Sequence, residues 1–277
     1  MKDLHSSYDL NDNIKIPVMG YGCYKAEGKE LIKGVKYATS LGYSLLDSAA
    51  YYHNEATVGE AIEECGQPRE NLFVISKIWP DAFDKPVDSL DKTLRDLKLE
   101  YLDAYLLHWP GLDEKRRLNA FEALLKEKEK GKIRVLGVSN FLQSHLNNLH
   151  KRFSLWLPIN QIEIHPYCQQ KELCDFCVER DIQIVSSVPL GRGAEFDNPV
   201  LIAISKKYGK SVPQVMLRWQ IQKAYIPIPK SVHPERIKAN ADIFDFSLSD
   251  QDMLEISSLD KPDNAGRVSK DPLKFPE

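Results

Sequence analysis

One stretch decides the fold: Ser44-Leu45-Leu46-Asp47-Ser48-Ala49-Ala50-Tyr51-Tyr52-His53-Asn54-Glu55. It begins as an apolar run of strand length and passes into small and polar residues just before a helical pattern. A carboxylate, Asp47, stands where the strand is expected to end, and a phenol, Tyr52, follows five residues later. Such an aspartate is a helix cap or a satisfied core acid at least as often as a catalytic group. Its meaning therefore depends on what recurs along the chain.

Apolar runs of similar length alternate with amphipathic helical patterns on both sides of this stretch. Strands are predicted at Val18–Gly22 and from near Ser44, Leu72, Ala104, Ile133, Ile159, Ile182 and Tyr225. The helical patterns are Lys29–Leu41, Ala56–Glu64, Val87–Leu97, Asp113–Lys130, Lys171–Arg180, Val200–Tyr208, Val212–Gln222 and Glu235–Ile243. Most strand runs lack polar alternation, which is typical of a parallel sheet covered by helices.

Eight strands in this alternation, with no Pro/Gly/Ser-rich linker between them, predict an α/β protein built as a single (β/α)8 TIM barrel domain over residues 1–277. An open doubly wound sheet is the alternative, but no G-x-G-x-x-G follows the first strand. The opening Tyr8–Pro17 alternates around Asn11-Asp12-Asn13, which predicts an N-terminal β-hairpin.

Composition and charge narrow the class of function. The chain is 43% hydrophobic and 28% charged with a formal net charge of -3, so it has no electrostatic footprint for nucleic acid or an anionic membrane. It has neither an apolar run near the ~20 residues of a membrane span nor a signal-peptide core at its start. We expect a cytoplasmic monomer that acts on a small molecule. The pair Cys174-x-x-Cys177 lies in a helical pattern, and we interpret it as core packing.

Polar side chains stand at the predicted carboxyl ends of the strands, which in a barrel open onto one mouth. They are Asp47, Lys77, His108, Ser139-Asn140, Gln161 to His165, Ser186-Ser187 and Lys230-Ser231. Taken singly, Lys77 is explained as an ion-pair partner of Asp47, and His108 as a core histidine. Taken together, a cation beside the Tyr52 phenol favours the phenolate, and the His108 imidazole can orient a substrate oxygen. The pattern predicts a proton-transfer site.

Several motifs resemble those of the aldo-keto reductases, in the family's order and across nearly the whole chain. They are Gly42-Tyr43-Ser44-Leu45-Leu46-Asp47-Ser48-Ala49-x-x-Tyr52-x-Asn54-Glu55, Phe73–Trp79, Tyr105–Pro110, Gly137–Phe141, Asn160–Pro166, Pro189-Leu190-Gly191 and Ile228–Ser231. The resemblance implies a (β/α)8 barrel with an N-terminal hairpin, as in the shorter microbial members. It also implies that Tyr52 is the general acid, tuned by Lys77 and Asp47, while His108 positions the carbonyl. Hydride would pass from NADPH to the carbonyl carbon, and no metal takes part.

The same resemblance implies a site for NADPH or NADP+. Ser139, Asn140 and Gln161 match the residues that hold the nicotinamide carboxamide. Lys230, Ser231 and Arg236 match a clamp on the 2′-phosphate, which favours NADPH over NADH, and Asn240 matches an adenine contact. Further cofactor contacts are expected at Gly22, Cys23, Asp47, Leu190 and Gly191.

Four departures from the family pattern bear on binding. Ser187 stands where an aromatic residue usually stacks on the nicotinamide, so either another residue covers the ring or the cofactor is held less firmly. Tyr24 replaces a common Trp in the pocket wall, and Cys23 replaces a common Thr. Many members carry a longer C-terminal loop over the substrate, so we expect an open pocket walled by Tyr24, Trp79 and Trp109. It would suit aldehydes or ketones with a hydrophobic or sugar-like body.

Two other functions compete with carbonyl reduction. A metal-dependent barrel hydrolase would use Asp47, His53, His108 and His165, but Lys77 would then lie among the ligands and no H-x-H pair is present. A non-catalytic NADPH-binding sensor or subunit on the same barrel is the second, because folds are reused without their chemistry.

Overall fold

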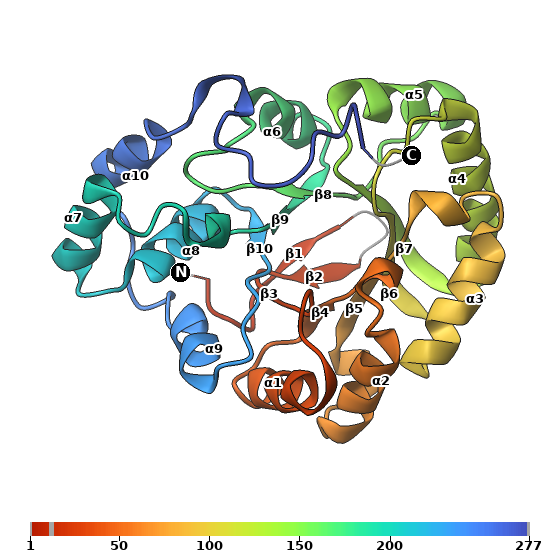
Figure 1. The fold of residues 1–277 in the computed structure, drawn as a ribbon, viewed down its shortest axis with the longest axis horizontal. Helices are drawn as coiled ribbons and strands as arrows, with labels where there is room; N and C mark the ends of the chain where they lie inside the picture. Colours follow the sequence, from red (N-terminus) through yellow and green to blue (C-terminus); the bar gives the residue numbers. More distant parts are fainter. Residues whose placement is uncertain (1, 11–13, 276–277) are drawn as a thin grey trace.

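The predicted strands form one parallel sheet of eight in the computed structural model, which describes residues 2–10 and 14–275 (Figure 1). Consecutive strands are neighbours from β3 to β10, and the backbone N–H of Gly22 donates to Pro229 O at 3.1 Å, which joins the two ends of the sheet. The (β/α)8 barrel is therefore confirmed. The strands are β3 (Gly20–Gly22), β4 (Leu45–Asp47), β5 (Phe73–Ile78), β6 (Leu102–Leu107), β7 (Ile133–Ser139), β8 (Ile159–Glu163), β9 (Gln183–Ser187) and β10 (Ile226–Pro227).

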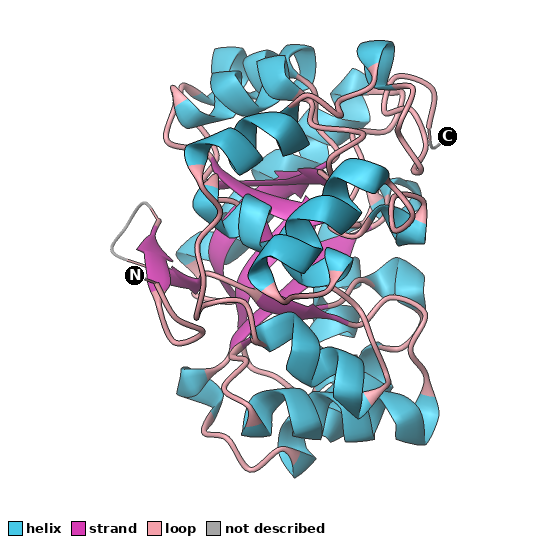
Figure 2. Ribbon diagram, turned by 90° about the vertical axis from the view of Figure 1, so that its left-hand side faces the viewer, coloured by secondary structure: helices cyan, strands magenta, loops and turns pink. Residues whose placement is uncertain are grey.

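Helices surround the strands on the outside of the barrel (Figure 2). They are α1 (Gly28–Ser40), α2 (Glu55–Glu64), α3 (Pro86–Leu97), α4 (Glu114–Glu129), α5 (Gln143–Phe153), α6 (Lys171–Val178), α7 (Pro199–Tyr208), α8 (Val212–Gln222), α9 (Pro234–Ala241) and α10 (Asp250–Ser257). The predicted helices include neither α5 nor α10. At α5 the usual polar N-cap is absent: Leu142 occupies that position, and its N–H donates to His145 Nδ1 at 3.2 Å.

The N-terminal hairpin is confirmed and closes one end of the barrel. Strands β1 (Ser7–Asp9) and β2 (Lys15–Pro17) pair antiparallel, with Tyr8 opposite Ile16. The expected turn, Asn11–Asn13, lies outside the described residues. Figure 2 shows the hairpin at the left-hand end of the barrel. Leu10 and Ile16 pack there against the apolar side chains that fill the barrel interior, among them Leu45, Ile75, Leu106 and Val185.

The core strands are buried on both faces, as their uninterrupted apolar sequence requires. Every residue of β4, β5 and β6 is buried. Cys174 and Cys177 on α6 belong to the core cluster between helices and sheet, in agreement with the packing interpretation. Over the described part of the chain, no helix has both the length and the apolar character needed to cross a membrane.

Candidate active site

The loop after β4 delivers a carboxylate and a phenol to the same mouth of the barrel. Asp47 ends β4, and the 3-10 helix η2 (Ala50–Tyr52) follows three residues later. Asn54 fixes this turn, because its side-chain N–H groups donate to Cys23 O at 2.8 Å and to Ala26 O at 2.9 Å. The turn is thus bound to the neighbouring β3 loop. Tyr52 is held in place by this arrangement.

Lys77 on β5 connects these two groups. Its side chain has no solvent exposure, and Nζ donates to Asp47 Oδ1 at 2.8 Å, to Ser48 O at 2.7 Å and to Tyr52 Oη at 3.3 Å. Burial lowers the pKa of Lys77, and the charge of Asp47 opposes that shift. The ion-pair explanation and the catalytic explanation of Lys77 therefore describe the same contacts.

The pKa of Tyr52 differs from the sequence expectation. A cation beside the phenol was expected to favour the phenolate, but the pKa of Tyr52 lies well above 10.0. Burial is the largest cause, followed by the negative charge of Asp47. Asp47 is therefore not only an anchor for Lys77, because it also opposes loss of the phenolic proton. Tyr52 stays protonated at neutral pH, which is the state that a proton donor requires.

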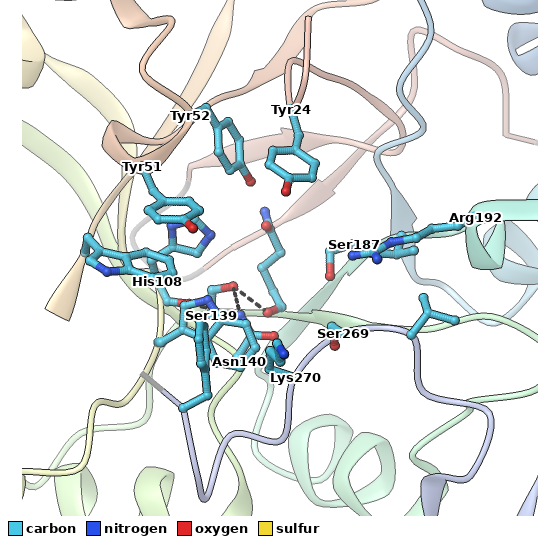
Figure 3. Close-up of a pocket in the computed structure, with 16 residues that line it drawn as sticks. Tyr24, Tyr51, Tyr52, His108, Ser139, Asn140, Ser187, Arg192, Ser269 and Lys270 are labelled. Atoms are coloured by element: carbon cyan, nitrogen blue, oxygen red, sulfur yellow. Dashed lines mark hydrogen bonds between the residues drawn. The ribbon is translucent and has the colours of Figure 1, made fainter. Parts of the chain in front are cut away.

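His108 lies after β6, beside Tyr52 (Figure 3). The two rings meet edge-on with 5.6 Å between their centroids and an interplanar angle of 77°. Burial and then the charge of Lys77 hold the pKa of His108 well below 6.5, so the imidazole is neutral. Its buried Nδ1 has no hydrogen-bond partner among the described residues. A neutral imidazole can share a hydrogen bond with a carbonyl oxygen without adding charge.

Ser139, Asn140 and Gln161 form a polar group on the next two strands. Ser139 Oγ donates to Gln161 O at 2.9 Å, and Asn140 Nδ2 donates to His108 O at 2.9 Å. Gln161 Nε2 donates to Asp47 Oδ2 at 2.7 Å, so this amide is connected to the carboxylate of the first loop. Asn140 adopts a left-handed φ of 61° and precedes the N-cap of α5, Leu142, so it is not a helix cap.

A cavity of about 490 Å³ opens above these groups. Tyr24, Trp79 and Trp109 line it as expected, but the wall is more extensive than that. Tyr51 stacks on Trp79 with 3.8 Å between ring centroids. Phe275 meets Trp79 and Trp109 edge-on at 5.9 and 5.1 Å.

The C-terminal segment adds Val268, Ser269 and Lys270 to the lining, a contribution that sequence reasoning missed. The open pocket expected from three aromatic residues is thus closed further on one side. These residues and Phe275 belong to no motif, so only the packing of the segment across the mouth brings them to the site.

A groove of about 310 Å³ continues from the cavity toward β10. It is lined by several of the residues expected to bind a cofactor, namely Gly22, Asp47, Gln161, Ser187, Leu190 and Lys230. Cys23 and Gly191 are buried beside the groove and are not part of its lining. Ser231, Arg236 and Asn240 lie further on, in and before α9, outside the lining. Ser231 Oγ accepts the N–H of His233 at 3.1 Å just before that helix.

Ser187 lies where the cavity and the groove meet. Tyr24, Val188 and Arg192 share this position with it, since each lines both hollows. Arg192 has a left-handed φ of 54° and is exposed. Sequence reasoning missed both Val188 and Arg192, because neither belongs to a polar strand-end pattern. Tyr24, Val188 and Arg192 therefore surround Ser187 at the junction of the two hollows.

The four ligands of the hydrolase alternative are not brought together. His53 is exposed and packs beside Tyr51, 6.0 Å between ring centroids. His165 is completely buried between two glutamates. Among the described residues, a different set brings potential ligand atoms within 4.8 Å of one another, Glu163, His165 and Cys168.

Comparison with known proteins agrees with this geometry. The family model described as "Aldo/keto reductase family" matches residues 19–261. Glyoxal reductase of Bacillus subtilis (strain 168) is 43% identical over 267 residues, which is 95% of this chain and 96% of that protein. Methylglyoxal reductase DkgA of Escherichia coli (strain K12) is 36% identical over 96% of both chains. Among solved structures, a mutant of Gox0644 in complex with NADPH has a TM-score of 0.93 and 32% identity over 99% of both chains.

Proposed function

Because the chain belongs to the aldo/keto reductase family and is an oxidoreductase that acts on carbonyl groups, we propose that it reduces small aldehydes and ketones with NADPH, using Tyr52 as the general acid. One observation carries the proposal. The Tyr52 hydroxyl, 3.3 Å from Lys77 Nζ, lies in the lining shared by the cavity and the groove. A carbonyl in the cavity and a nicotinamide at the junction of cavity and groove would meet there.

The groove residues fit a dinucleotide phosphate. A Cβ on Gly22 would approach Ile228 O to 2.8 Å, so the absence of a side chain lets the backbone at Gly22 lie close to the backbone of Ile228 in the groove lining. Lys230 supplies a cation to the lining, and Arg236 follows in the first turn of α9. Cations near a helix start suit a phosphate group. We propose Lys230, Ser231 and Arg236 for the 2′-phosphate, Asn240 for adenine, and Ser139, Asn140 and Gln161 for the carboxamide.

The reaction follows from these positions. NADPH held by these residues would supply the hydride that the carbonyl carbon receives. Tyr52, protonated because its pKa is high, gives its proton to the carbonyl oxygen as negative charge develops there. The Lys77 ammonium, held by Asp47, stabilises the phenolate left behind. His108, neutral because its pKa is low, holds the oxygen in line with Tyr52.

The cavity and the relatives support small, reactive carbonyls as substrates. The named activities of two relatives concern glyoxal and methylglyoxal. A cavity of about 490 Å³ lined with Trp79, Trp109 and Phe275 also has room for an aromatic aldehyde. We propose both classes as substrates, short dicarbonyls and aldehydes with an apolar body.

Tyr52→Phe tests the acid. We expect kcat for methylglyoxal reduction, followed by NADPH absorbance, to fall at least ~100-fold, since a general acid contributes about 10²–10⁴-fold. The Kd of this variant for NADPH, measured by fluorescence titration, should equal that of the wild type. In the same titration, we expect the wild type to bind NADH more weakly than NADPH.

Tyr51→Phe is the matched control, because this neighbouring phenol is exposed, stacks on Trp79 and makes no contact with Lys77 in the described hydrogen bonds. We expect near-wild-type kcat in this variant. Full activity in Tyr52→Phe would remove Tyr52 from the mechanism. Tight NADPH binding by the wild type without turnover of any carbonyl would instead indicate a non-catalytic NADPH-binding subunit.

A further inference from the structure

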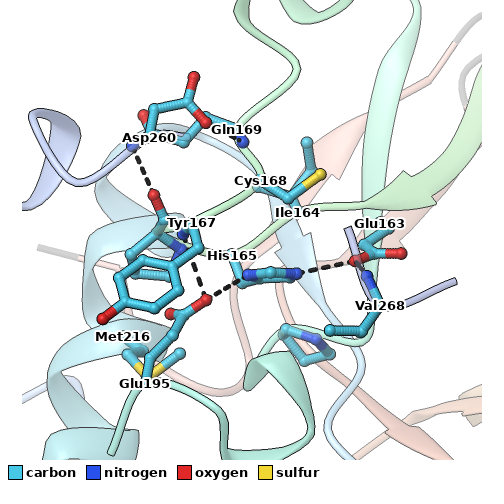
Figure 4. A network of polar contacts seen from close by, with 12 residues as sticks. Glu163, Ile164, His165, Tyr167, Cys168, Gln169, Glu195, Met216, Asp260 and Val268 are labelled. Atoms are coloured by element: carbon cyan, nitrogen blue, oxygen red, sulfur yellow. Dashed lines mark hydrogen bonds and ion pairs between the residues drawn. The ribbon is translucent and has the colours of Figure 1, made fainter. Parts of the chain in front are cut away.

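A buried ion triad lies behind the active site and outside the mechanism. His165 stands between Glu163, at the end of β8, and Glu195, in the loop before α7 (Figure 4). Its Nε2 is 2.8 Å from Glu163 Oε1, and its Nδ1 contacts Glu195 Oε1. All three side chains have no solvent exposure. Burying an imidazole and two carboxylates away from water costs free energy. Such a cluster is stable only where its members bind one another and nearby hydrogen-bonding groups.

Glu163 holds the C-terminal wall of the substrate cavity. Its Oε1 accepts the backbone N–H of Val268 at 2.7 Å, and its Oε2 accepts the backbone N–H of Ser269 at 2.8 Å. Both residues line the cavity. The preceding residue, Arg267, is linked to Glu163 through Gln170. Arg267 donates to Gln170 Oε1 at 2.7 Å, and Gln170 Nε2 donates to Glu163 O at 2.6 Å.

The other end of the triad supports the loop beside the cofactor groove. Gly191 packs directly on it: a Cβ at this residue would lie 2.9 Å from Glu195 Oε1 and 3.3 Å from His165 Nδ1. Gly191 has a left-handed φ of 53° and connects Leu190 with Arg192, both of which line the groove. Glu195 Oε1 also accepts the N–H of Tyr167 at 3.2 Å.

The triad is not a cation site, although Glu163, His165 and Cys168 bring ligand atoms close together. Both ring nitrogens of His165 already face carboxylates, and both oxygens of Glu163 accept backbone N–H groups. Burial alone would lower the pKa of His165, but its two carboxylate partners raise the pKa to about 9, so the ring is a cation at neutral pH. Burial alone would raise the pKa of Glu163, but hydrogen bonds from His165 and Ser269 lower that pKa to about 2.

We propose that Glu163, His165 and Glu195 are positioning residues, which fix the Val268–Ser269 wall of the substrate cavity and the Gly191–Arg192 edge of the cofactor groove relative to each other. None of them touches substrate or cofactor. Their effect is selectivity: a large aldehyde depends on the fixed wall, whereas a short dicarbonyl that reaches only Tyr52 and His108 does not. The effect on substrate selectivity rests on the proposed reductase function. The immobilisation of the Val268–Ser269 wall does not depend on that function.

Glu163→Gln tests the wall. The new amide turns an NH2 group toward one of the two backbone N–H donors, so we expect the Val268 and Ser269 amides to exchange with deuterium faster than in the wild type. The KM for 4-nitrobenzaldehyde should rise about fivefold, because the Val268–Ser269 wall would no longer be held in a fixed position against its ring. The kcat, and the KM for methylglyoxal, should remain within about twofold because Tyr52, Lys77 and His108 are untouched.

Asp252→Asn is the matched control. Asp252 is also a buried carboxylate that binds a lysine, at 2.8 Å from Lys207 Nζ, and a backbone N–H, that of Ser249 at 3.2 Å, but it lies in α10 away from both hollows. It should lower thermal stability without changing the ratio of kcat/KM between the two aldehydes. Glu163→Asp keeps the negative charge but moves the carboxylate oxygens away from the Val268 and Ser269 amides. It replaces Glu163→Gln in these measurements if that variant does not fold.

Glu195→Gln tests the contact between the triad and the Gly191–Arg192 edge of the cofactor groove. It keeps an acceptor for Tyr167 and removes the charge that faces His165 and Gly191, so we expect the Kd for NADPH to rise about threefold, as for one weakened hydrogen bond. Unchanged exchange at Val268 and Ser269 in both Glu163 variants would overturn the proposal, and so would an equal loss of selectivity in Asp252→Asn. A wild type that turns over neither aldehyde would reject the proposed function, and the exchange measurement would still decide the role of the triad.

Discussion

Lys77 bonds three oxygens from a position with no access to water: Asp47 Oδ1, Ser48 O and Tyr52 Oη. Those contacts use all three of its protons. A buried cation of this kind is stable only because each donor is matched, and removal of Asp47 would leave an uncompensated charge. The same requirement that stabilises the fold therefore sets the distance between the ammonium and the phenol. Structure and proposed chemistry depend on one set of bonds.

Ser187 gives a prediction at the same scale. Replacing Ser187 by Tyr introduces a ring at the junction of cavity and groove, beside Val188 and Arg192. If the nicotinamide lies there, stacking should lower the Kd for NADPH about three- to tenfold, since an aromatic pair contributes about 0.5–1.5 kcal/mol. Fluorescence titration measures the change.

The control for this substitution is Ser187→Ala, which removes the hydroxyl and adds no ring. Its Kd for NADPH should stay close to that of the wild type. Weaker binding in Ser187→Tyr than in Ser187→Ala would mean that Arg192 or another neighbour already occupies the space over the ring.

Among the elements, α2 and α3 approach each other so closely that one contact position has no room for a side chain. The contact occurs at Gly59, where a Cβ would lie 2.7 Å from Leu97 O and 2.8 Å from Asp96 O. Both obstacles are backbone atoms at the end of α3, which cannot rotate away. The start of α2 carries Glu55, which accepts a hydrogen bond from Thr93 on α3 at 3.2 Å. The packing of these helices therefore supports the loop that carries Tyr52.

Gly59→Ala should destabilise the protein. Overpacking of this kind costs about 1–3 kcal/mol, and a lower urea midpoint with an unchanged m-value would report it. Glu60→Ala, at an exposed position one residue along the same helix, should change the free energy of unfolding by less than about 0.5 kcal/mol. An equal effect of the two substitutions would contradict the role of the close contact.

For the molecule as a whole, the buried triad makes stability depend on pH. The pKa of His165 is raised from an ordinary 6.5 to about 9, so the folded state binds this proton more tightly than the unfolded state. The stabilisation is then fully present below pH 6.5 and is lost as the pH rises through about 9. Of the groups that face the ring, Glu163 has a pKa of about 2 and the Cys168 thiol one of about 12, so neither titrates in this window.

Urea unfolding of the wild type and of His165→Gln, from about pH 6 to about pH 10, measures this contribution. The free energy of unfolding of the wild type should exceed that of the variant most at the acidic end, and the difference should shrink through the window where the imidazolium loses its proton. A difference that stays constant with pH would show that His165 carries no linked proton.

The sequence by itself determined the barrel, because strands buried on both faces need uninterrupted apolar runs and leave their polar residues at the ends. It also determined which polar side chains meet: Asp47, Tyr52, Lys77 and His108 stand at fixed offsets from those strand ends. The sequence analysis missed α5, because an apolar residue, Leu142, stands at its N-cap position and the hydrogen bond there is made by the side chain of His145.

Only the tertiary structure decided the rest of the site. The pKa of Tyr52 depends on burial and on Asp47 as well as on Lys77, and burial is not visible in a motif. The Val268–Ser269 part of the wall is bound by one distant carboxylate, Glu163, which accepts the backbone N–H groups of both residues. Backbone N–H groups are present at every residue except proline, so no sequence pattern marks which of them a buried glutamate will bind.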